Sequence, residues 1–167
     1  MERIPVTLAN GRLLRLSTGR HKALVKKIID EFCPFFTPGG YIVYVGDASK
    51  KLTCFDATIL QELGVTALDR RKMPNIMVHH EAKNRLFLIE AVPNHEPVNP
   101  KRRKELKELF AGTKAGLVFV TAFLNRHKMM KYLDEISWET EVWVAESPTH
   151  LIHFNGERFL GPYEEGD

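Results

Sequence analysis

Cysteines and long apolar runs are scarce in these 167 residues. The two cysteines, Cys33 and Cys54, follow no metal-ligand spacing, and we interpret both as reduced residues that fill a hydrophobic core. The longest apolar runs, 86–89 and 116–120, are much shorter than the roughly 20 residues that cross a bilayer. The first residues hold no apolar signal core, so the sequence predicts a cytoplasmic protein without membrane contact.

Several catalytic motifs are also missing. The sequence has no Gly-rich nucleotide loop and no Gly-x-Ser-x-Gly elbow, and neither cysteine has a histidine pattern near it. These absences exclude nucleotide-loop, serine-elbow and thiol nucleophile chemistry of those kinds. The hydrophobic content of 44% and charged content of 27% are those of a globular protein, and the length fits a single domain over residues 1–167.

Hydrophobic periodicity and turn residues predict the elements of the first half. We expect a hairpin over about 4–16, an amphipathic helix over 20–32 that ends at Pro34, a buried strand over 41–45 and a helix over 56–63.

The second half predicts strands and helices in alternation. They are antiparallel strands over 76–79 and 86–92, a helix over 101–110 capped by Asn99, a strand over 116–123, a helix over 126–136, a strand over 138–145 and a C-terminal hairpin over 151–160. The helix after 86–92 can cross over to a parallel strand at 116–123, whereas the pair before it is antiparallel. The predicted fold is therefore α/β or α+β, with a mixed sheet flanked by helices.

Glu90 is the most informative residue because it interrupts the apolar run LFLIEAV. Burying an unpaired carboxylate is costly, so a cation has to accompany it. One interpretation is a hard metal ion such as Mg²⁺, which takes carboxylate oxygens and substrate phosphate as ligands. The other is a structural ion pair with Lys101 or Arg102. The residues alone leave both open.

Polar residues beyond the strand at 41–45 form a second candidate group. Asp47 could orient a basic group there, and Lys51 could stabilise charge on a phosphate, although a solvated turn has the same composition. Net charge is +3, and the cations concentrate in the segments 70–72, 101–104 and 126–128. Solvated helix ends and phosphate contacts both explain such clusters.

Four stretches resemble the C-terminal domain of BsuBI/PstI restriction endonucleases. They are YIVYVGDASKKLTCFD, MPNIMVHHEAKNRLFLIEAV, AGLVFVTAFLNR and ISWETEVWVAESPTHLIHFNGERFLGPY. The resemblance extends over about 4–163. It implies the helix and strand order of the PD-(D/E)xK nuclease core, here with an extra short helix at 56–63.

The resemblance also implies an activity, which is Mg²⁺-dependent hydrolysis of duplex DNA at a palindrome such as CTGCAG, with Mn²⁺ as a substitute. Reading a palindrome favours a homodimer. By position, Asn75 falls on the PD element and Glu90 on the acidic element, so both are the expected metal ligands. Lys51 falls on a lysine that the family keeps, and Asp47 lies beside it in the same segment.

The sequence departs from the PD-(D/E)xK pattern at two places. Val92 stands where the motif has its lysine, so the cation must come from elsewhere, from Lys51 or, as fallbacks, from Lys101 or Arg102. Asn75 stands where the motif has an aspartate, which keeps an oxygen but removes the charge that holds a dication. Either the substitution inactivates the chain or another carboxylate compensates. The nearest candidates are Asp47, Asp56 and Glu31.

We expect Lys101, Arg102, Arg103 and Arg126 to contact the phosphates of DNA, which position a duplex without specifying its sequence. Asn75 also favours a rival function, a catalytically silent DNA-binding module. A structure-specific or repair nuclease on the same core is a further alternative.

Overall fold

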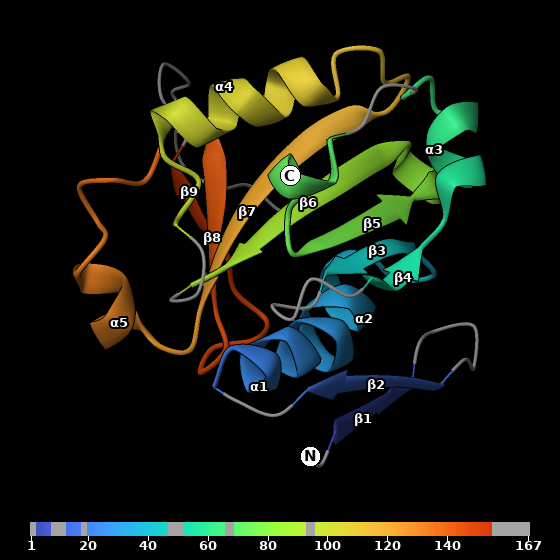
Figure 1. The fold of residues 1–167 in the computed structure, drawn as a ribbon. Coiled ribbons are helices and arrows are strands. Elements are labelled where there is room, and N and C mark those ends of the chain that lie inside the picture. Colours follow the sequence, from blue (N-terminus) through green and yellow to red (C-terminus); the bar gives the residue numbers. More distant parts are fainter. Residues whose placement is uncertain are drawn as a thin grey trace.

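A computed structural model describes residues 3–7, 13–17, 20–46, 52–65, 69–92 and 96–154. Across this part of the chain, seven strands form one sheet in the order β4-β3-β5-β6-β7-β8-β9 (Figure 1). The strands are β3 Tyr41–Gly46, β4 Leu52–Phe55, β5 Ile76–His80, β6 Arg85–Ala91, β7 Gly116–Phe123, β8 Thr140–Val144 and β9 Ile152–Phe154.

The sheet is mixed, as the sequence predicts. The strand β6 pairs antiparallel with β5 and parallel with β7, and β7 pairs parallel with β8. The remaining neighbours are antiparallel. The helix α4, Pro100–Leu109, makes the crossover from β6 to β7 that parallel neighbours require.

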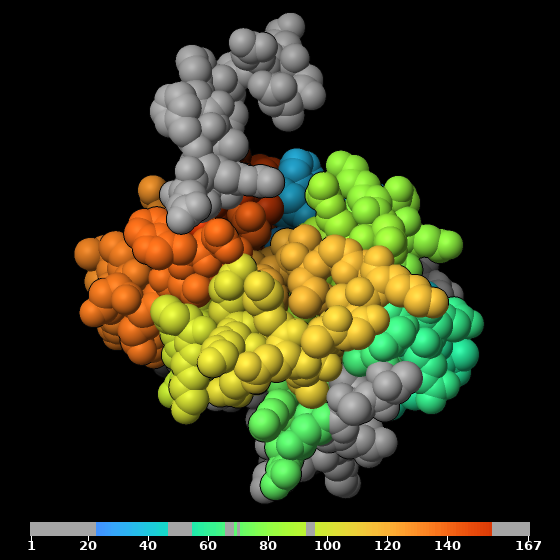
Figure 2. Space-filling view, turned by 90° about the horizontal axis from the view of Figure 1, so that it is seen from above, coloured from blue at the N-terminus to red at the C-terminus, as the bar shows by residue number. Residues whose placement is uncertain are grey.

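Helices cover both faces of this sheet (Figure 1). On one face lie α1 Arg20–Lys27, the π-helical turn η1 Ile28–Phe32 and α2 Cys33–Phe36. On the other lies α4, which Figure 2 shows in yellow between the orange residues that follow α5 and the teal residues of α3. The shorter elements are α3 Ala57–Glu62, η2 Arg70–Lys72, η3 Glu81–Lys83 and α5 Arg126–Met130. None of the described helices is long and apolar enough to span a membrane.

A small antiparallel sheet of β1 Arg3–Thr7 and β2 Leu13–Ser17 lies beside α1 (Figure 1). Its pairing confirms the hairpin predicted for about 4–16, whose turn lies outside the described residues.

The core fills both faces of the sheet, which explains why the central strands read as continuous apolar runs. Ile89 of β6 packs toward α1 with Phe32 and Trp143, whereas Leu88 packs toward α4 with Leu106. Successive residues of a strand point to opposite faces. Glu90 therefore points to the α4 face, inside an apolar layer.

The structure corrects two predicted helix ends. Pro34 does not end the first helix, because helical conformation continues to Phe36. The π-helical turn bonds the Cys33 N–H to the Ile28 carbonyl, five residues back, and Pro34, which has no N–H to donate, then lies in the first turn of α2. The helix predicted over 126–136 stops at Met130. Beyond it the chain continues as turns, in which the Tyr132 N–H bonds to the Met129 carbonyl and the Glu135 N–H to the Tyr132 carbonyl, three residues back in each case.

Two strands also differ from the prediction. The sequence pattern missed β4, a four-residue edge strand that pairs with β3. The first arm of the predicted C-terminal hairpin is β9, but its described partner is β8, and the rest of that hairpin lies outside the described residues.

Candidate functional site

Asn75 lies directly before β5, and Glu90 lies near the end of the neighbouring strand β6. Asn75 precedes and Glu90 follows the register pair Ile76–Ile89, so the two residues adjoin the same end of the antiparallel pairing. The side-chain oxygen Oδ1 of Asn75 accepts a 2.7 Å hydrogen bond from the backbone N–H of Ala91. Both polar side chains are buried. The structure therefore brings together the two residues that the sequence predicts as metal ligands.

Arg102 neutralises Glu90 in this structure. Its Nε and Nη2 groups donate hydrogen bonds of 3.0 and 2.7 Å to the same carboxylate oxygen, Oε1. The Glu90 side chain is 1% exposed and that of Arg102 is 16% exposed, so the pair lies under the surface at the inner side of α4. A third nitrogen, Nη1, lies 3.5 Å from the Glu105 carboxylate. The structure thus shows the ion pair, which is one of the two interpretations of Glu90 that the sequence leaves open. The other interpretation, a metal site, stays a prediction.

Burial raises the pKa of Glu90 from 4.5 to about 7. The guanidinium of Arg102 works in the opposite direction, through its charge and its hydrogen bonds, but does not outweigh the loss of water. Carboxyl groups with such raised pKa values concentrate at functional sites, where a buried carboxylate is kept despite its cost.

The N-terminus of α4 is anchored so that Arg102 faces the sheet. The Asn99 side chain caps the helix by accepting a 2.7 Å hydrogen bond from the Arg102 backbone N–H. One residue earlier, Val98 donates its N–H to the hydroxyl of buried Thr121 at 3.0 Å and accepts from the Ser137 N–H at 2.9 Å. Because the parallel register sets Thr121 beside Glu90, the same strand pair holds both the carboxylate and the helix start.

The chain leaves β3 beside this site. Gly46, the last residue of β3, donates its backbone N–H to the carbonyl oxygen of Asn75 at 2.8 Å. Asp47 and Lys51, the predicted catalytic partners, follow in the sequence but lie outside the described residues. Their assignment stays a prediction, which the position of Gly46 supports.

The four predicted phosphate-binding residues have different environments. Lys101 is exposed at the start of α4. Arg103 donates a 2.8 Å hydrogen bond to Glu139 and lies over the Phe119 ring at 5.5 Å. Arg126 is exposed and lies 3.7 Å from a carboxylate of Glu146. Arg102 points inward to Glu90, so its side chain is the least accessible of the predicted phosphate contacts.

The described carboxylates proposed as substitutes for an aspartate at position 75 have other partners. Asp56 caps α3 by accepting from the Ile59 N–H and also accepts from the Tyr41 hydroxyl. Glu31 lies 3.8 Å from Lys27, one helical turn away. Within the ranges that the structure describes, no three histidine, cysteine, aspartate or glutamate side chains group closely enough to hold a metal ion.

Sequence reasoning missed Thr121 and Val98 as supports of the site. One signal was available, because Thr121 interrupts the apolar run GLVFVTAF in the way that Glu90 interrupts its own run. No sequence signal marks Val98, because the backbone N–H of Val98 makes the bond to Thr121.

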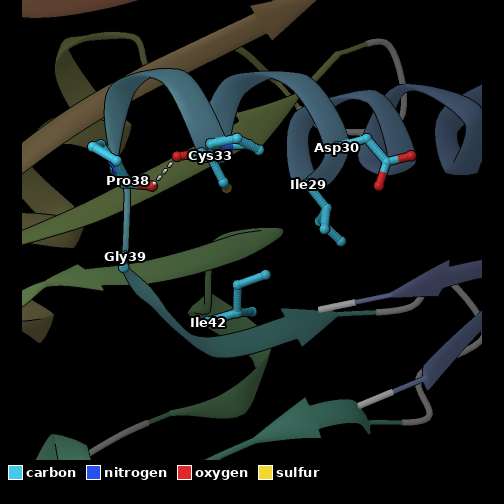
Figure 3. Close-up of a pocket in the computed structure, with 9 residues that line it drawn as sticks. Ile29, Asp30, Cys33, Pro38, Gly39 and Ile42 are labelled. Atoms are coloured by element: carbon cyan, nitrogen blue, oxygen red, sulfur yellow. Dashed lines mark hydrogen bonds between the residues drawn. The ribbon is translucent and has the colours of Figure 1, made fainter. Parts of the chain in front are cut away.

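A pocket of about 340 Å³ opens elsewhere, between the η1–α2 segment and the start of β3 (Figure 3). Ile29, Cys33 and Ile42 line it, and the Thr37 hydroxyl donates a 2.9 Å hydrogen bond to the Cys33 carbonyl. Burial raises the pKa of the Cys33 thiol to about 12, so this thiol is no nucleophile at neutral pH. The pocket lies toward the α1 face, whereas Glu90 faces α4, so we do not include it in the candidate site.

Comparisons with known proteins agree with this geometry. The fold is that of a restriction endonuclease, since the solved structure of the SdaI restriction endonuclease superimposes with a TM-score of 0.89 and 47% identity, over 97% of this chain and 51% of that one. The family model for the BsuBI/PstI restriction endonuclease domain matches residues 4–157. The chain therefore belongs to the BsuBI/PstI restriction endonuclease family, which confirms the resemblance seen in the sequence.

Two curated relatives are type II restriction enzymes. BsuBI of Bacillus subtilis is 51% identical over 162 residues, and AplI of Arthrospira platensis is 30% identical over 166 residues. The matches cover 97% and 95% of this chain but 51% of each relative. The chain thus spans about half the length of the curated relatives it matches.

Proposed function

We propose that this chain is the catalytic domain of a Mg²⁺-dependent type II restriction endonuclease that hydrolyses duplex DNA at a short palindrome like CTGCAG. The observation that carries the proposal is the buried carboxylate of Glu90, which adjoins the same end of the β5–β6 pairing as Asn75 and lies 2.7 Å from a guanidinium nitrogen. Metal-assisted phosphodiester hydrolysis needs oxygen ligands for the metal ion and a positive group that stabilises charge on the phosphate, and these residues offer both.

The described donors fit a hard divalent cation that keeps several of its waters. Such a cation needs only one or two carboxylates together with a substrate phosphate. Glu90 supplies a carboxylate in an apolar layer, where its burial favours any cation that neutralises it. Glu90 and Asn75 would hold Mg²⁺, with Mn²⁺ as a substitute. When bound, the ion would polarise the scissile phosphate and acidify an attacking water.

The protein groups around this site then have separate tasks. Lys51 stabilises the negative charge that builds up on the phosphate, and Asp47 orients Lys51. Water attacks phosphorus in line, the bond to the 3′ oxygen breaks, and the products are a 5′-phosphate and a 3′-hydroxyl. The position of Gly46 supports this assignment. Its N–H bonds to the Asn75 carbonyl, and Asp47 is the next residue in the chain.

We propose that Lys101, Arg103 and Arg126 contact the phosphates of DNA, with Arg102 nearer the site. Two copies of the chain related by a two-fold axis would meet the two halves of a palindrome with the same surface, so we propose a homodimer, acting in the cytoplasm.

Asn75 also supports a second function, a catalytically silent DNA-binding module. Its Oδ1 atom accepts a hydrogen bond from the Ala91 N–H, so the amide oxygen faces Ala91 and the NH₂ group points away from Ala91. An aspartate in this pose would present a second oxygen instead. The amide therefore weakens metal binding in both its charge and its orientation.

Mapping of DNA ends after incubation with Mg²⁺ or Mn²⁺ tests the proposal. We expect Asn75→Asp to cleave at least about 10-fold faster than the parent chain, since loss of a metal-site partner costs about 10–100-fold. Glu90→Ala should abolish cleavage. Glu108→Ala removes an exposed carboxylate of α4 and serves as the matched control.

The outcomes separate the alternatives. Cleavage at one palindrome supports the restriction enzyme, and cleavage set by DNA structure supports a repair nuclease. Specific binding without cleavage, in the parent and in Asn75→Asp alike, supports the silent module. Equal activity in the parent, Asn75→Asp and Glu90→Ala would refute the site.

A further inference from the structure

We propose that Arg102 exchanges partners during the reaction: it neutralises Glu90 until a divalent cation binds there, and then contacts the scissile phosphate. This inference rests on the proposed function and adds to it a positioning and charge-stabilising role for one residue. It differs from a simple phosphate contact, because it makes Arg102 a competitor of the metal.

The hydrogen bonds of Arg102 leave room for such an exchange. Nε and Nη2 both donate to one oxygen of Glu90, Oε1. The pair therefore differs from the bidentate arrangement, in which two guanidinium nitrogens each bond to a different carboxylate oxygen. Nη1 reaches toward the Glu105 carboxylate, whose side chain is 34% exposed. Arg102 thus spans the boundary between a buried anion and the solvent side of α4.

Charge balance gives the direction of the exchange. In the buried layer one guanidinium neutralises one carboxylate. A divalent cation bound to Glu90 supplies two positive charges, which neutralise the carboxylate and repel the guanidinium of Arg102. The scissile phosphate brings one negative charge, and attack by a water that has lost a proton to solvent adds a second to the phosphoryl oxygens. Arg102 can match that second charge.

The start of α4 keeps the guanidinium close during this movement. Asn99 caps the helix at Arg102, and Val98 is bonded to both Thr121 and Ser137. The backbone therefore stays in place while the long side chain changes its partner. The first turn of α4 also carries Lys101, Arg102 and Arg103 but no acidic residue. Cations at the positive end of a helix cost stability, which is consistent with anions as their partners.

The neighbouring cations are less suited to this role. Arg103 is engaged by Glu139 and covers the Phe119 ring, and Lys101 is exposed at the helix start. Arg102 is the cation of α4 that touches the candidate metal ligand.

Calcium affinity without DNA tests the competition. Isothermal titration with Ca²⁺ at pH 8.5 would compare the parent chain with Arg102→Met, Arg102→Lys and the control Lys107→Met. Lys107 is an exposed cation of the same helix, so its removal changes net charge equally. We expect Arg102→Met to bind Ca²⁺ at least about 10-fold more tightly, because a competing cation is gone, and Lys107→Met to change affinity by less than about twofold. Unchanged or weaker Ca²⁺ binding by Arg102→Met would overturn the proposal.

Single-turnover cleavage at saturating Mg²⁺ tests the second half of the exchange. We expect Arg102→Met to cut about 100-fold more slowly, as for loss of one charge-stabilising donor, with Arg102→Lys between it and the parent. A merely structural role would weaken metal binding and cleavage together, whereas the exchange moves them in opposite directions. Parental cleavage rates in Arg102→Met would refute the phosphate contact.

Two controls keep the test decisive. Arg102→Lys retains a cation, so it reports on the exchange if Arg102→Met fails to fold. If no form of the chain, Asn75→Asp included, cleaves DNA, the proposed function fails. Tighter Ca²⁺ binding by Arg102→Met would then still support the exchange at Glu90.

Discussion

Glu90→Gln should make the protein more stable at alkaline pH, because the buried carboxyl resists ionisation. The folded-state pKa of about 7 lies above the ordinary value of 4.5. The protonated carboxyl therefore stabilises the fold, and this stabilisation is fully present below pH 4.5 and lost as pH rises through 7. Each pKa unit corresponds to about 1.4 kcal/mol, so the full loss is about 3 kcal/mol. Glutamine has nearly the same shape and does not titrate.

Urea denaturation at pH 5 and pH 8, with a chelator present, measures this effect. At pH 5 we expect the two proteins to differ by about 1 kcal/mol or less, and at pH 8 we expect Glu90→Gln to be more stable by about 3 kcal/mol. Glu108→Gln, which alters an exposed carboxylate of α4, should follow the parent at both pH values. A parent more stable than Glu90→Gln at pH 8 would refute the reasoning, because the ion pair with Arg102 would then outweigh burial.

Two further predictions concern the helix start and the buried thiol. Asn99→Ala removes the cap of α4 and should lower the free energy of unfolding by about 1 kcal/mol, measured in urea; no loss would mean that the cap is replaced. In a Cys54→Ser variant, Cys33 should react with an alkylating reagent at pH 8 at least about 100-fold more slowly when folded than in urea, because burial raises its thiol pKa to about 12. Equal rates would contradict that burial.

Local signals in the sequence located most of the elements around the site. Apolar runs located the strands on both sides of Glu90, and Asn99 followed by Pro100 located the start of α4. These signals act over a few residues and need no partner. Prediction failed where a partner decides the structure, as in β4, a four-residue strand that pairs with β3.

Pro34 illustrates a different limit. A proline inside a helical pattern normally ends the helix, and the pattern predicted that end. The π-helical turn before it changes which carbonyl each N–H reaches, and sequence periodicity does not record such a change. The helical segment therefore extends past the proline to Phe36.

The sequence by itself determined that Glu90 lies in an apolar strand, that a cation must accompany it, and that the chain resembles BsuBI/PstI nucleases. It left open whether that cation is a metal, Lys101 or Arg102. The tertiary structure decided that Arg102 reaches Glu90, although the two residues are 12 positions apart. The reason is the crossover of α4, which turns its first helical turn back over the end of β6, a geometry that only the assembled sheet imposes.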